Sequence, residues 1–408
     1  MEKWSPLSKL SDSSVTGEVF INDLRKAGEL DGIEEKFRIV NIAAVHISEG
    51  KGYLSKVYRC DVTFEPLSGV NEAPPSLSVA LKQPCSTAMD AVFNDKNETP
   101  EMREKAKGAL DHFHDMIKKF HNHECTFYNI FSNSGLPLPK LYGSSEWDEN
   151  NEGYLLFEYV KNGKFMALDE GLTLGQAKSL LKFIAKMQAV GYQKKKLWEN
   201  KFTRPDFGNS DADVGGSIME KVGKGGSEAF KKLHRRFGKF YTDHDTVKFA
   251  SGDKWFDFGL PTALTHGDMW SSNLNFKTGV QSDEINAIID WQVVHDGNPM
   301  IDVSRILLVC CDSDVRRALE PTVCQFLYDE VKQALGHAPP YSIDDLVISK
   351  RYADLSSLFF AMFLPGVHFH NDDDETQAKK ARFMQRLEDL MEDQISIIEE
   401  HFPTLLVD

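Results

Sequence analysis

Short strand-like runs of apolar and polar residues alternate with loops in the first third of the chain. Three runs, FRIVNIAAVHI, YLSKVYRCDVTF and LSVALKQP, are separated by linkers rich in Ser, Pro and Glu, and GYLLFEYV forms a further apolar run at 153–160. Between them, residues 101–131 carry apolar positions at helical spacing, including Phe120 and Phe127. These periods predict an antiparallel sheet accompanied by one long helix.

Helical periodicity replaces this alternation after the polar link KNGK. In LTLGQAKSLLKFIAKMQAVG, Leu180 and Ile184 fall on one stripe, and the last predicted helix covers about 376–401. We therefore expect an α+β protein with two lobes, a small sheet-rich lobe over residues 1–158 and a larger helical lobe over residues 159–408. Ligands commonly bind between domains, so a cleft between the lobes is expected.

Composition narrows the classes of protein and partner. The chain has 408 residues, 41% of them apolar and 27% charged, with a net charge of −15. This acidic balance disfavours nucleic acid and anionic membranes as partners. No stretch approaches the roughly 18 apolar residues of a membrane span, and the first residues lack the apolar segment of a secretion signal, so we expect a cytoplasmic protein. The six cysteines show no CxxC pair, which argues against a zinc site or a disulfide framework.

The segment THGDMWSSN combines His266, Asp268 and Asn273 with a glycine and two serines, and it has little apolar periodicity. An Asn five residues after the Asp of H-x-D is the spacing of a kinase catalytic loop. Phosphoryl transfer needs one carboxylate at the acceptor hydroxyl and an amide oxygen that helps to hold Mg²⁺. We therefore predict that Asp268 orients and deprotonates the acceptor and that Asn273 binds Mg²⁺. The alternative is a simple turn capped by Asn273.

Asp290 ends a short apolar strand in INAIIDWQ, 22 residues after Asp268. The kinase pattern places its metal-binding aspartate at this point, and Mg²⁺ is a hard cation that prefers oxygen ligands. An aspartate at the end of a strand can also simply begin a turn. Because Asp268 and Asn273 lie upstream, we favour Asp290 as the second Mg²⁺ ligand.

A glycine-containing hairpin is predicted in ISEGKGYLSKVYR. Gly50, Gly52, Ser55 and Val57 fill the frame G-x-G-x-x-G-x-V, with serine in place of the third glycine. Glycines let a backbone approach phosphate closely, so this hairpin is predicted to cover the nucleotide. Taken alone, the same residues fit an ordinary hairpin turn.

Lys82 lies in VALKQP, where alternation places it on the face opposite Val79 and Leu81. From there a lysine reaches the α- and β-phosphates of a nucleotide, if an anionic partner holds it. Glu124 in HECTFY is the predicted partner, because the neighbouring phenylalanines indicate a buried helix face; the alternative is a solvated glutamate. Backbone groups of the strand that connects the lobes are predicted to bind adenine, namely those of Glu158, Tyr159 and Val160.

These blocks resemble a known superfamily. THGDMWSSN, IIDWQ with the following GNPMIDVSRIL, and VALKQP with HECTFY are similar to segments of the aminoglycoside phosphotransferase and choline kinase superfamily, within it the choline-kinase-like branch that includes ecdysteroid-kinase-like proteins. The resemblance spans about residues 40–370. It implies a protein-kinase-like fold, Mg-ATP as phosphoryl donor and a small-molecule hydroxyl as acceptor; choline, ethanolamine, a steroid alcohol and a sugar-bearing metabolite all fit. It also implies that Asp302 and His266 support the catalytic loop.

Two departures from the family stand beside the metal-binding aspartate. Trp291 and Gln292 occupy positions where protein kinases have Phe and Gly, and where choline kinases tend to have a second carboxylate; the Gln292 amide still offers an oxygen to a metal. A protein kinase is not supported, because no A-P-E element follows Asp290 and only eleven residues separate it from Asp302. The remaining alternative to a small-molecule kinase is a catalytically silent protein that binds a nucleotide or another ligand.

Overall fold

The computed structural model describes six stretches of the chain, residues 5–48, 54–85, 100–204, 209–250, 254–369 and 373–407. Side chains are described within them except at 100–113, 209–214 and 254–255. The chain forms two compact units, Met1–Lys161 and Asn162–Asp408. Gly50 and Gly52 of the predicted phosphate-covering hairpin lie outside the described residues.

In the part of the N-terminal unit, Met1–Lys161, that the structure describes, an antiparallel sheet has five strands in the order β1-β2-β3-β5-β4. Their bounds are β1 Phe37–His46, β2 Ser55–Pro66, β3 Leu77–Pro84, β4 Leu141–Ser145 and β5 Tyr154–Glu158. The predicted antiparallel sheet is therefore confirmed, with β4 as an additional strand. All positions of β4 (LYGSS) are half-buried, and it has no apolar alternation, which explains why the pattern did not predict it.

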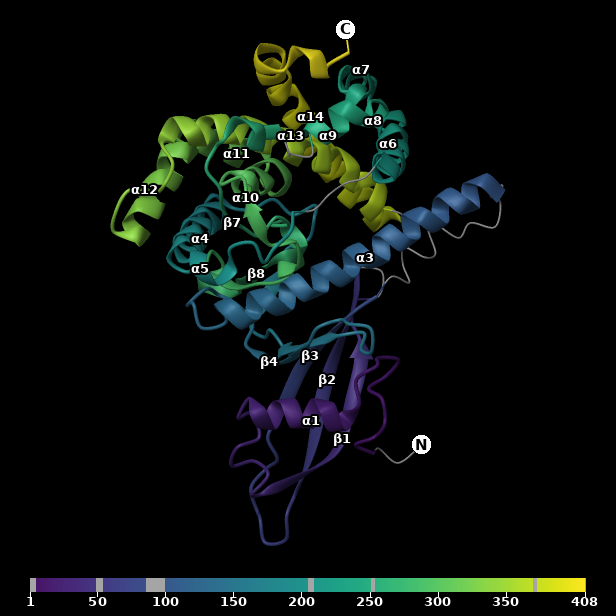
Figure 1. Cartoon of the computed structure of the whole chain (residues 1–408), viewed down its shortest axis with the longest axis vertical. Helices are drawn as coiled ribbons and strands as arrows, with labels where there is room; N and C mark the ends of the chain where they lie inside the picture. Colours follow the sequence, from purple (N-terminus) through teal and green to yellow (C-terminus); the bar gives the residue numbers. More distant parts are fainter. Residues whose placement is uncertain are drawn as a thin grey trace. The chain divides into compact units, whose positions relative to one another are not determined.

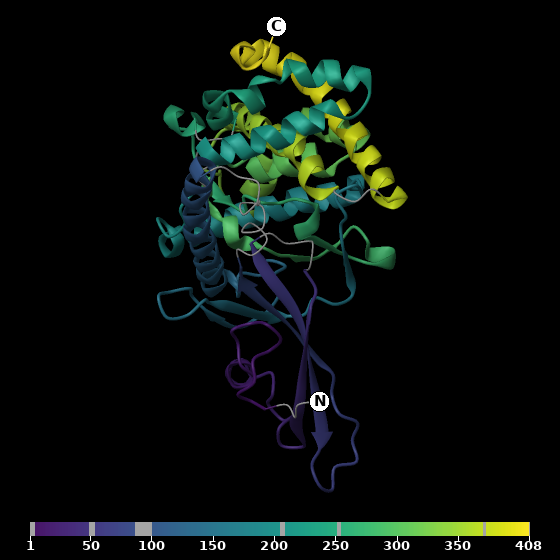
Figure 2. The same cartoon turned by 90° about the vertical axis from the view of Figure 1, so that its right-hand side faces the viewer.

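Two helices cover opposite faces of this sheet. α1 (Gly17–Lys26) lies beside the long strands β1 and β2 (Figures 1 and 2) and packs Phe20 into a core that includes Leu81 of β3. α3 (Pro100–Phe131) lies against the other face. Because side chains alternate along a strand, Lys82 is on the face that α3 covers.

The described residues of the C-terminal unit, Asn162–Asp408, include two small groups of strands. One group has the order β6-β8-β9, and β7 pairs with β10 in antiparallel register. The bounds are β6 Gly163–Phe165, β7 Ala263–Thr265, β8 Leu274–Lys277, β9 Ile285–Ile288 and β10 His295–Gly297. These strands flank both predicted chemical segments, since THGDMWSSN runs from β7 to β8 and Asp290 follows β9.

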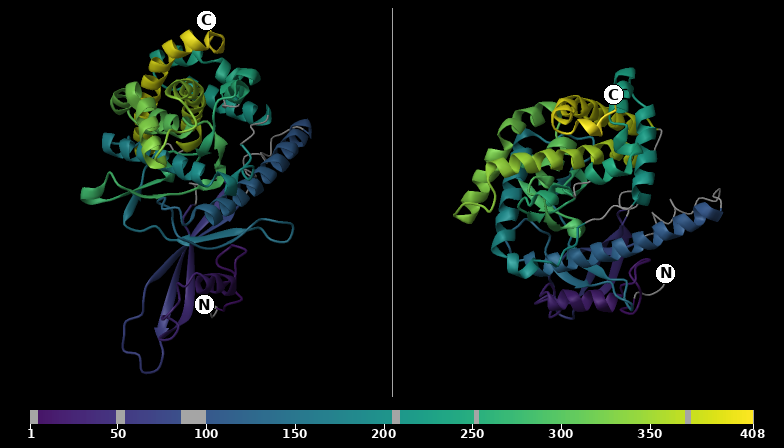
Figure 3. Two further views of the ribbon diagram at one scale, coloured as in Figure 1. Left: turned by 60° about the vertical axis from the view of Figure 1, so that its left-hand side comes forward. Right: turned by 45° about the horizontal axis from the view of Figure 1, so that its top comes forward.

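Helices make up most of the rest of this unit. α13 (Ile343–His368) and α14 (Asp374–His401) lie side by side (Figure 3). The other helices are α4 Leu174–Gln193, α5 Lys195–Trp198, α6 Asn209–Lys224, α7 Glu228–Arg236, α8 Lys239–Thr242, α9 His244–Ala250, α10 Ile301–Arg305, α11 Ser313–Leu319 and α12 Val323–Leu335. Within the described residues, no helix has the length and apolar character needed to cross a membrane.

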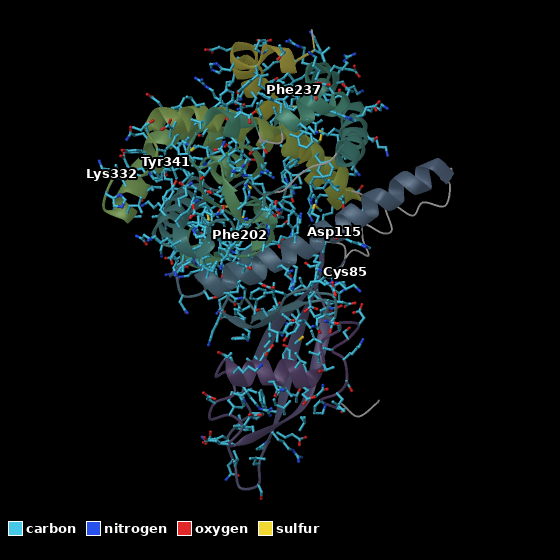
Figure 4. The ribbon with its side chains drawn as sticks, in the orientation of Figure 1. Cys85, Asp115, Phe202, Phe237, Lys332 and Tyr341 are labelled. Carbon is cyan, nitrogen blue, oxygen red and sulfur yellow. The ribbon has the colours of Figure 1, made fainter. Side chains whose placement is uncertain are left out.

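α4 carries the predicted apolar stripe and is hydrogen-bonded to the segment that precedes α10. Leu180 and Ile184 are fully buried, as the pattern predicted. Next to them, Gln188 Nε2 donates to Pro299 O at 2.7 Å, and Gln188 Oε1 accepts from the hydroxyl of Tyr341 (labelled in Figure 4) at 2.8 Å. Because α10 begins two residues after Pro299, these bonds help to fix the start of that helix.

Candidate active site

Asp302, in α10, fastens the loop that follows β7. Its two carboxylate oxygens accept hydrogen bonds from adjacent backbone N–H groups, Oδ2 from His266 at 2.8 Å and Oδ1 from Gly267 at 2.9 Å. Burial raises the pKa of Asp302 to about 6, and the two N–H donors oppose this increase. Gly267 has φ +80°, and an added Cβ would lie 2.7 Å from Val293 O, so glycine alone fits here without strain.

His266 links the same loop to the strand that precedes Asp290. Its Nδ1 accepts the backbone N–H of Asp268 at 3.2 Å, so Nε2 carries the ring hydrogen and donates it to Ile289 O at 3.0 Å. The ring is fully buried and packs against Trp291, with ring centroids 4.5 Å apart. His266 therefore holds the two chemical segments together.

Asn273 and Asp290 are brought together by the pairing of β8 with β9. The Ile289 N–H donates to Asn273 O at 3.2 Å, so Asp290 follows a residue that is bonded to both Asn273 and His266. Asn273 Nδ2 donates to Asp268 O at 2.8 Å, which leaves the amide oxygen Oδ1 as its acceptor group. The negative charge of Asp290 also raises the pKa of Asp268, so the two carboxylates are within electrostatic reach of each other.

The backbone at Asp290 is strained. Its dihedral angles are φ 67° and ψ 58°, a left-handed conformation that costs about 1–3 kcal/mol for a residue other than glycine. Gln292 Nε2 donates to Asp290 Oδ2 at 3.3 Å, and Trp291 Nε1 donates to Ile288 O at 3.1 Å. Trp291 and Gln292 thus orient the turn that carries Asp290. Strained backbone of this kind is concentrated at functional sites.

Asp268 is half-buried and has several polar neighbours. Trp270 Nε1 donates to its Oδ2 at 3.2 Å, and Asn273 Nδ2 donates to the same oxygen at 3.4 Å. Burial and the charge of Asp290 raise the pKa of Asp268 to about 6, whereas the charge of Arg305 and the N–H groups of Trp270 and Asn273 oppose the increase. A carboxylate with a pKa near neutral pH is suited to accept a proton from a substrate.

Lys82 and Glu124 form the predicted ion pair in the N-terminal unit, with Lys82 Nζ 2.6 Å from Glu124 Oε2. β3 supplies the lysine and α3 the glutamate. Lys82 is 9% exposed and Glu124 is 1% exposed. Charges buried to this extent require a partner, so each side chain fixes the position of the other.

The described part of the predicted phosphate-covering hairpin lies at the start of β2. Ser55 is the first residue of β2, and Val57 follows two residues later. The Val57 N–H donates to Ser48 Oγ at 2.9 Å, and Val57 O accepts the Ile47 N–H at 2.8 Å. These bonds hold Ile47 and Ser48 beside Val57.

The predicted adenine-binding segment follows β5. Glu158 is the last residue of that strand, and its N–H donates to Lys140 O at 2.8 Å. Arg59 lies over the Tyr159 ring, 5.1 Å from its centre, and Val160 is half-buried. The segment is thus ordered by the edge of the sheet and by one cation–π contact.

Two residues of the C-terminal site were not predicted from the sequence, Trp270 and Arg305. Arg305 is 7% exposed, its guanidinium carbon lies 3.8 Å from the centre of the Phe360 ring, and the charges of Asp268 and Asp302 attract it. Its only signal in the sequence is its place in α10, one helical turn after Asp302. Trp270 stands in the quoted loop motif two residues after Asp268, but only the contact with that carboxylate gives it a role.

Comparison with known sequences identifies a family and two relatives. The sequence model of the family DUF1679, described as "Uncharacterized oxidoreductase dhs-27", matches residues 35–402. The Caenorhabditis elegans protein of that name is 26% identical over 261 residues, which cover 62% of this chain but only 31% of that protein. "Uncharacterized kinase-like protein D1044.1" from Caenorhabditis elegans is 24% identical over 356 residues, which cover 80% of this chain and 84% of that protein.

Solved structures resemble this chain over most of its length. A choline kinase from Cryptosporidium parvum gives a TM-score of 0.50 at 11% identity and covers 93% of this chain and 96% of that chain. A putative aminoglycoside phosphotransferase from Ralstonia eutropha gives a TM-score of 0.43 at 12% identity, with coverage of 90% and 97%. The likeness to the choline kinase shows the fold alone. The predicted protein-kinase-like fold is thereby confirmed, with a five-stranded antiparallel sheet followed by a largely helical remainder.

Proposed function

Because this chain belongs to the DUF1679 family and has a protein-kinase-like fold, we propose that it is an ATP- and Mg²⁺-dependent small-molecule kinase. It transfers the γ-phosphoryl group of ATP to a hydroxyl group of a small metabolite. The observation that carries this proposal is the gathering of Asp268, Asn273 and Asp290 around the loop after β7. The kinase-like name of D1044.1 supports it, whereas the name of dhs-27 belongs to a protein of which this chain matches 31%.

The side-chain oxygens of Asp290 and Asn273 are suitable ligands for Mg²⁺. Asp290 offers a carboxylate, and Asn273 offers Oδ1 because its Nδ2 is bonded to Asp268 O. Mg²⁺ prefers hard oxygen ligands and binds through one or two protein groups, since it keeps water and phosphate oxygens in its shell. We therefore assign Asp290 and Asn273 as the protein ligands, with Gln292 orienting the Asp290 carboxylate.

Asp268 is the proposed general base. The acceptor oxygen forms a bond to the γ-phosphorus while the bond from that phosphorus to the bridging oxygen breaks, and the electron pair of the broken bond stays with ADP. The hydroxyl proton moves to the Asp268 carboxylate, which Trp270 and Asn273 hold in place through their N–H groups. Bound Mg-ATP supplies the phosphoryl group and the positive charge that offsets its oxygens.

In the N-terminal unit, Lys82 is the proposed ligand of the donor phosphates. The ion pair with Glu124 holds its ammonium group in one position, which reduces the entropy lost when a phosphate binds. The segment with Gly50, Gly52, Ser55 and Val57 is proposed to cover the phosphates, and the backbone of residues 158–160 is proposed to bind adenine.

The substitution Asp268→Asn tests the proposal. Wild-type chain with γ-labelled ATP, Mg²⁺ and a metabolite extract is expected to label one or a few products, and Asp268→Asn is expected to be about 10²–10⁴-fold slower. Mg-ATP binding, measured alongside by calorimetry, should persist in the variant. The exposed residue Asp314 provides a matched control, because Asp314→Asn should leave both transfer and binding unchanged.

The catalytically silent alternative predicts a different pair of results. Equal nucleotide binding by wild type and Asp268→Asn, with no labelled product from either protein, would favour a nucleotide-binding protein without turnover. A labelled product whose rate of formation is unaffected by Asp268→Asn would refute the assigned base.

A further inference from the structure

Arg305 is a buried cation of the candidate active site. Only 7% of the residue is exposed, and within the part of the chain that the structure describes its guanidinium forms no salt bridge and its Nε donates no hydrogen bond. Buried charges are normally paired and buried N–H groups bonded, because their lost hydration is otherwise not replaced. A cation left in this state at a candidate active site indicates a group that binds a ligand.

The carboxylates that attract Arg305 are bonded to other groups. Both oxygens of Asp302 accept backbone N–H groups, and Oδ2 of Asp268 accepts the indole N–H of Trp270. The guanidinium carbon instead lies 3.8 Å from the centre of the Phe360 ring. This cation–π contact replaces part of the lost hydration but supplies no anionic partner.

Aromatic side chains stand next to Asp268 and Arg305. The Trp270 ring lies 5.9 Å from the Phe360 ring and 5.0 Å from the His368 ring, and we call these three residues the aromatic cluster. Phe360 and His368 both belong to α13, so one helix carries most of the cluster past the candidate base. The cluster offers apolar surface to an organic acceptor, and Arg305 offers a positive charge beside it.

Resting on the proposed kinase activity, we propose that Arg305 binds the anionic oxygens of the phosphoryl group as it passes to the acceptor and that it excludes cationic alcohols. The acceptor is therefore a neutral or anionic alcohol whose apolar part contacts the aromatic cluster. Asp268 attracts Arg305 electrostatically. A phosphoryl group that is transferred to a hydroxyl at Asp268 therefore comes close to Arg305. A fixed cation at this place stabilises the charge on the transferring oxygens.

A choline-like acceptor meets two obstacles at this site. A quaternary ammonium group binds best on aromatic faces, and Arg305 already occupies a face of Phe360. It would also meet a like charge. In a partly buried site such a repulsion weakens binding by about tenfold or more. Choline and ethanolamine are therefore disfavoured among the acceptors compatible with the family resemblance.

Thermal unfolding of the full chain distinguishes an anion-binding arginine from a structural one. Arg305→Met removes the buried charge and keeps most of the side-chain volume, so its unfolding midpoint is expected to equal or exceed that of wild type. Inorganic phosphate, added at constant ionic strength, should raise the midpoint of wild type more than that of Arg305→Met. A midpoint several degrees lower in Arg305→Met, together with an undiminished phosphate effect, would make Arg305 a structural cation and overturn the proposal.

Two further variants locate the phosphate effect. Phosphate is also expected to bind at Lys82, so the same comparison is made between Lys82→Met and the double variant Lys82→Met/Arg305→Met. The part of the stabilisation that depends on Arg305 should persist in the Lys82→Met background, and its disappearance there would overturn the proposal. The exposed residue Arg235 gives a matched control, since Arg235→Met should leave the phosphate effect unchanged.

The acceptor class is tested with a metabolite extract divided on a cation-exchange resin. With γ-labelled ATP and Mg²⁺, wild-type chain is expected to label products in the unretained fraction, which holds neutral and anionic alcohols. Labelling confined to the retained fraction would overturn the assigned acceptor class. Absence of labelling with both fractions, with the Arg305-dependent phosphate effect intact, would refute the kinase activity and leave the anion-binding site standing.

Discussion

Two buried cations of this chain are accommodated in opposite ways. In the N-terminal unit, Lys82 is paired with Glu124 at 2.6 Å. In the C-terminal unit, Arg305 lies over the Phe360 ring and has no salt bridge among the described residues. A paired cation is compensated before any ligand binds, whereas an unpaired one destabilises the folded chain until an anion binds. The ammonium group of Lys82 is thus held in position before a ligand binds. The charge of Arg305 is compensated only when an anionic ligand binds.

Removing the charge that pairs with Lys82 is expected to give the largest loss of stability. Glu124→Gln leaves a buried ammonium group beside a neutral amide, and breaking a buried pair in this way costs about 3–5 kcal/mol. Urea unfolding followed by circular dichroism would show the loss as an earlier transition. The double variant Lys82→Met/Glu124→Gln lacks both charges and should recover most of it. Equal stability of Glu124→Gln and wild type would show that Glu124 does not compensate the charge of Lys82, and the two cations would then not differ in this respect.

Buried histidines extend the comparison to groups that stay neutral. Burial lowers the pKa of His234 from 6.5 to about 4, and it lowers that of His121 to the same extent. Between these two pH values the unfolded chain binds more protons than the folded chain. The free energy of unfolding therefore falls as the pH falls from 6.5 to 4, by up to about 3 kcal/mol for each histidine.

Urea unfolding across this pH window isolates one of these histidines. His234→Leu should lose its share of the acid sensitivity, while the exposed control His337→Leu should behave as wild type. An unchanged pH dependence in His234→Leu would show that His234 accepts a proton in the folded chain.

Asp302 is a buried anion whose charge is compensated by two backbone N–H groups. It therefore resembles Lys82, a buried cation whose charge is compensated by Glu124. In Asp302→Asn the amide has one acceptor oxygen, so one N–H of His266 or Gly267 loses its partner at a cost of about 1–3 kcal/mol. Amide hydrogen exchange at these two residues should accelerate about tenfold or more. Exchange rates equal to those of wild type would mean that Asp302 does not hold the loop.

Trp270→Phe should have the smallest effect. It keeps an aromatic ring in the cluster but removes the N–H that donates to Asp268, so phosphoryl transfer should slow about 3–10-fold while Mg-ATP binding is unchanged. Trp198→Phe is the matched control, because it removes an indole N–H bonded to Gly191 O, away from the loop. That control should reduce stability without slowing transfer. Identical transfer rates in Trp270→Phe and wild type would remove Trp270 from the site.

The predictable features depend on local patterns. Alternation in VALKQP put Lys82 on the face opposite Leu81, and the structure confirms both that placement and the ion pair with Glu124. The contiguous motif around Asp268 and the strand end at Asp290 are also local signals, and the pairing of β8 with β9 brings them together.

The features that were not predicted depend on tertiary contacts or on weak patterns. β4 is a short strand without apolar alternation, and α1 is a helix of ten residues that buries Phe20 and Leu24; both elements pack on the sheet. Arg305 is unusual only because its charge is buried over Phe360, 55 residues further along the chain, while both oxygens of Asp302 are bonded elsewhere. No local pattern around Arg305 contains that information.

The proposed activity requires that Asp290 and Asn273 hold Mg²⁺ with the nucleotide beside Asp268. Calorimetric titration of ATP with and without Mg²⁺, on wild type and on Asp290→Asn, tests it most directly. We expect Mg²⁺ to strengthen ATP binding to wild type about tenfold or more, and Asp290→Asn to lose most of this gain while it still binds ATP weakly without metal. The same dependence on Mg²⁺ in both proteins would contradict it.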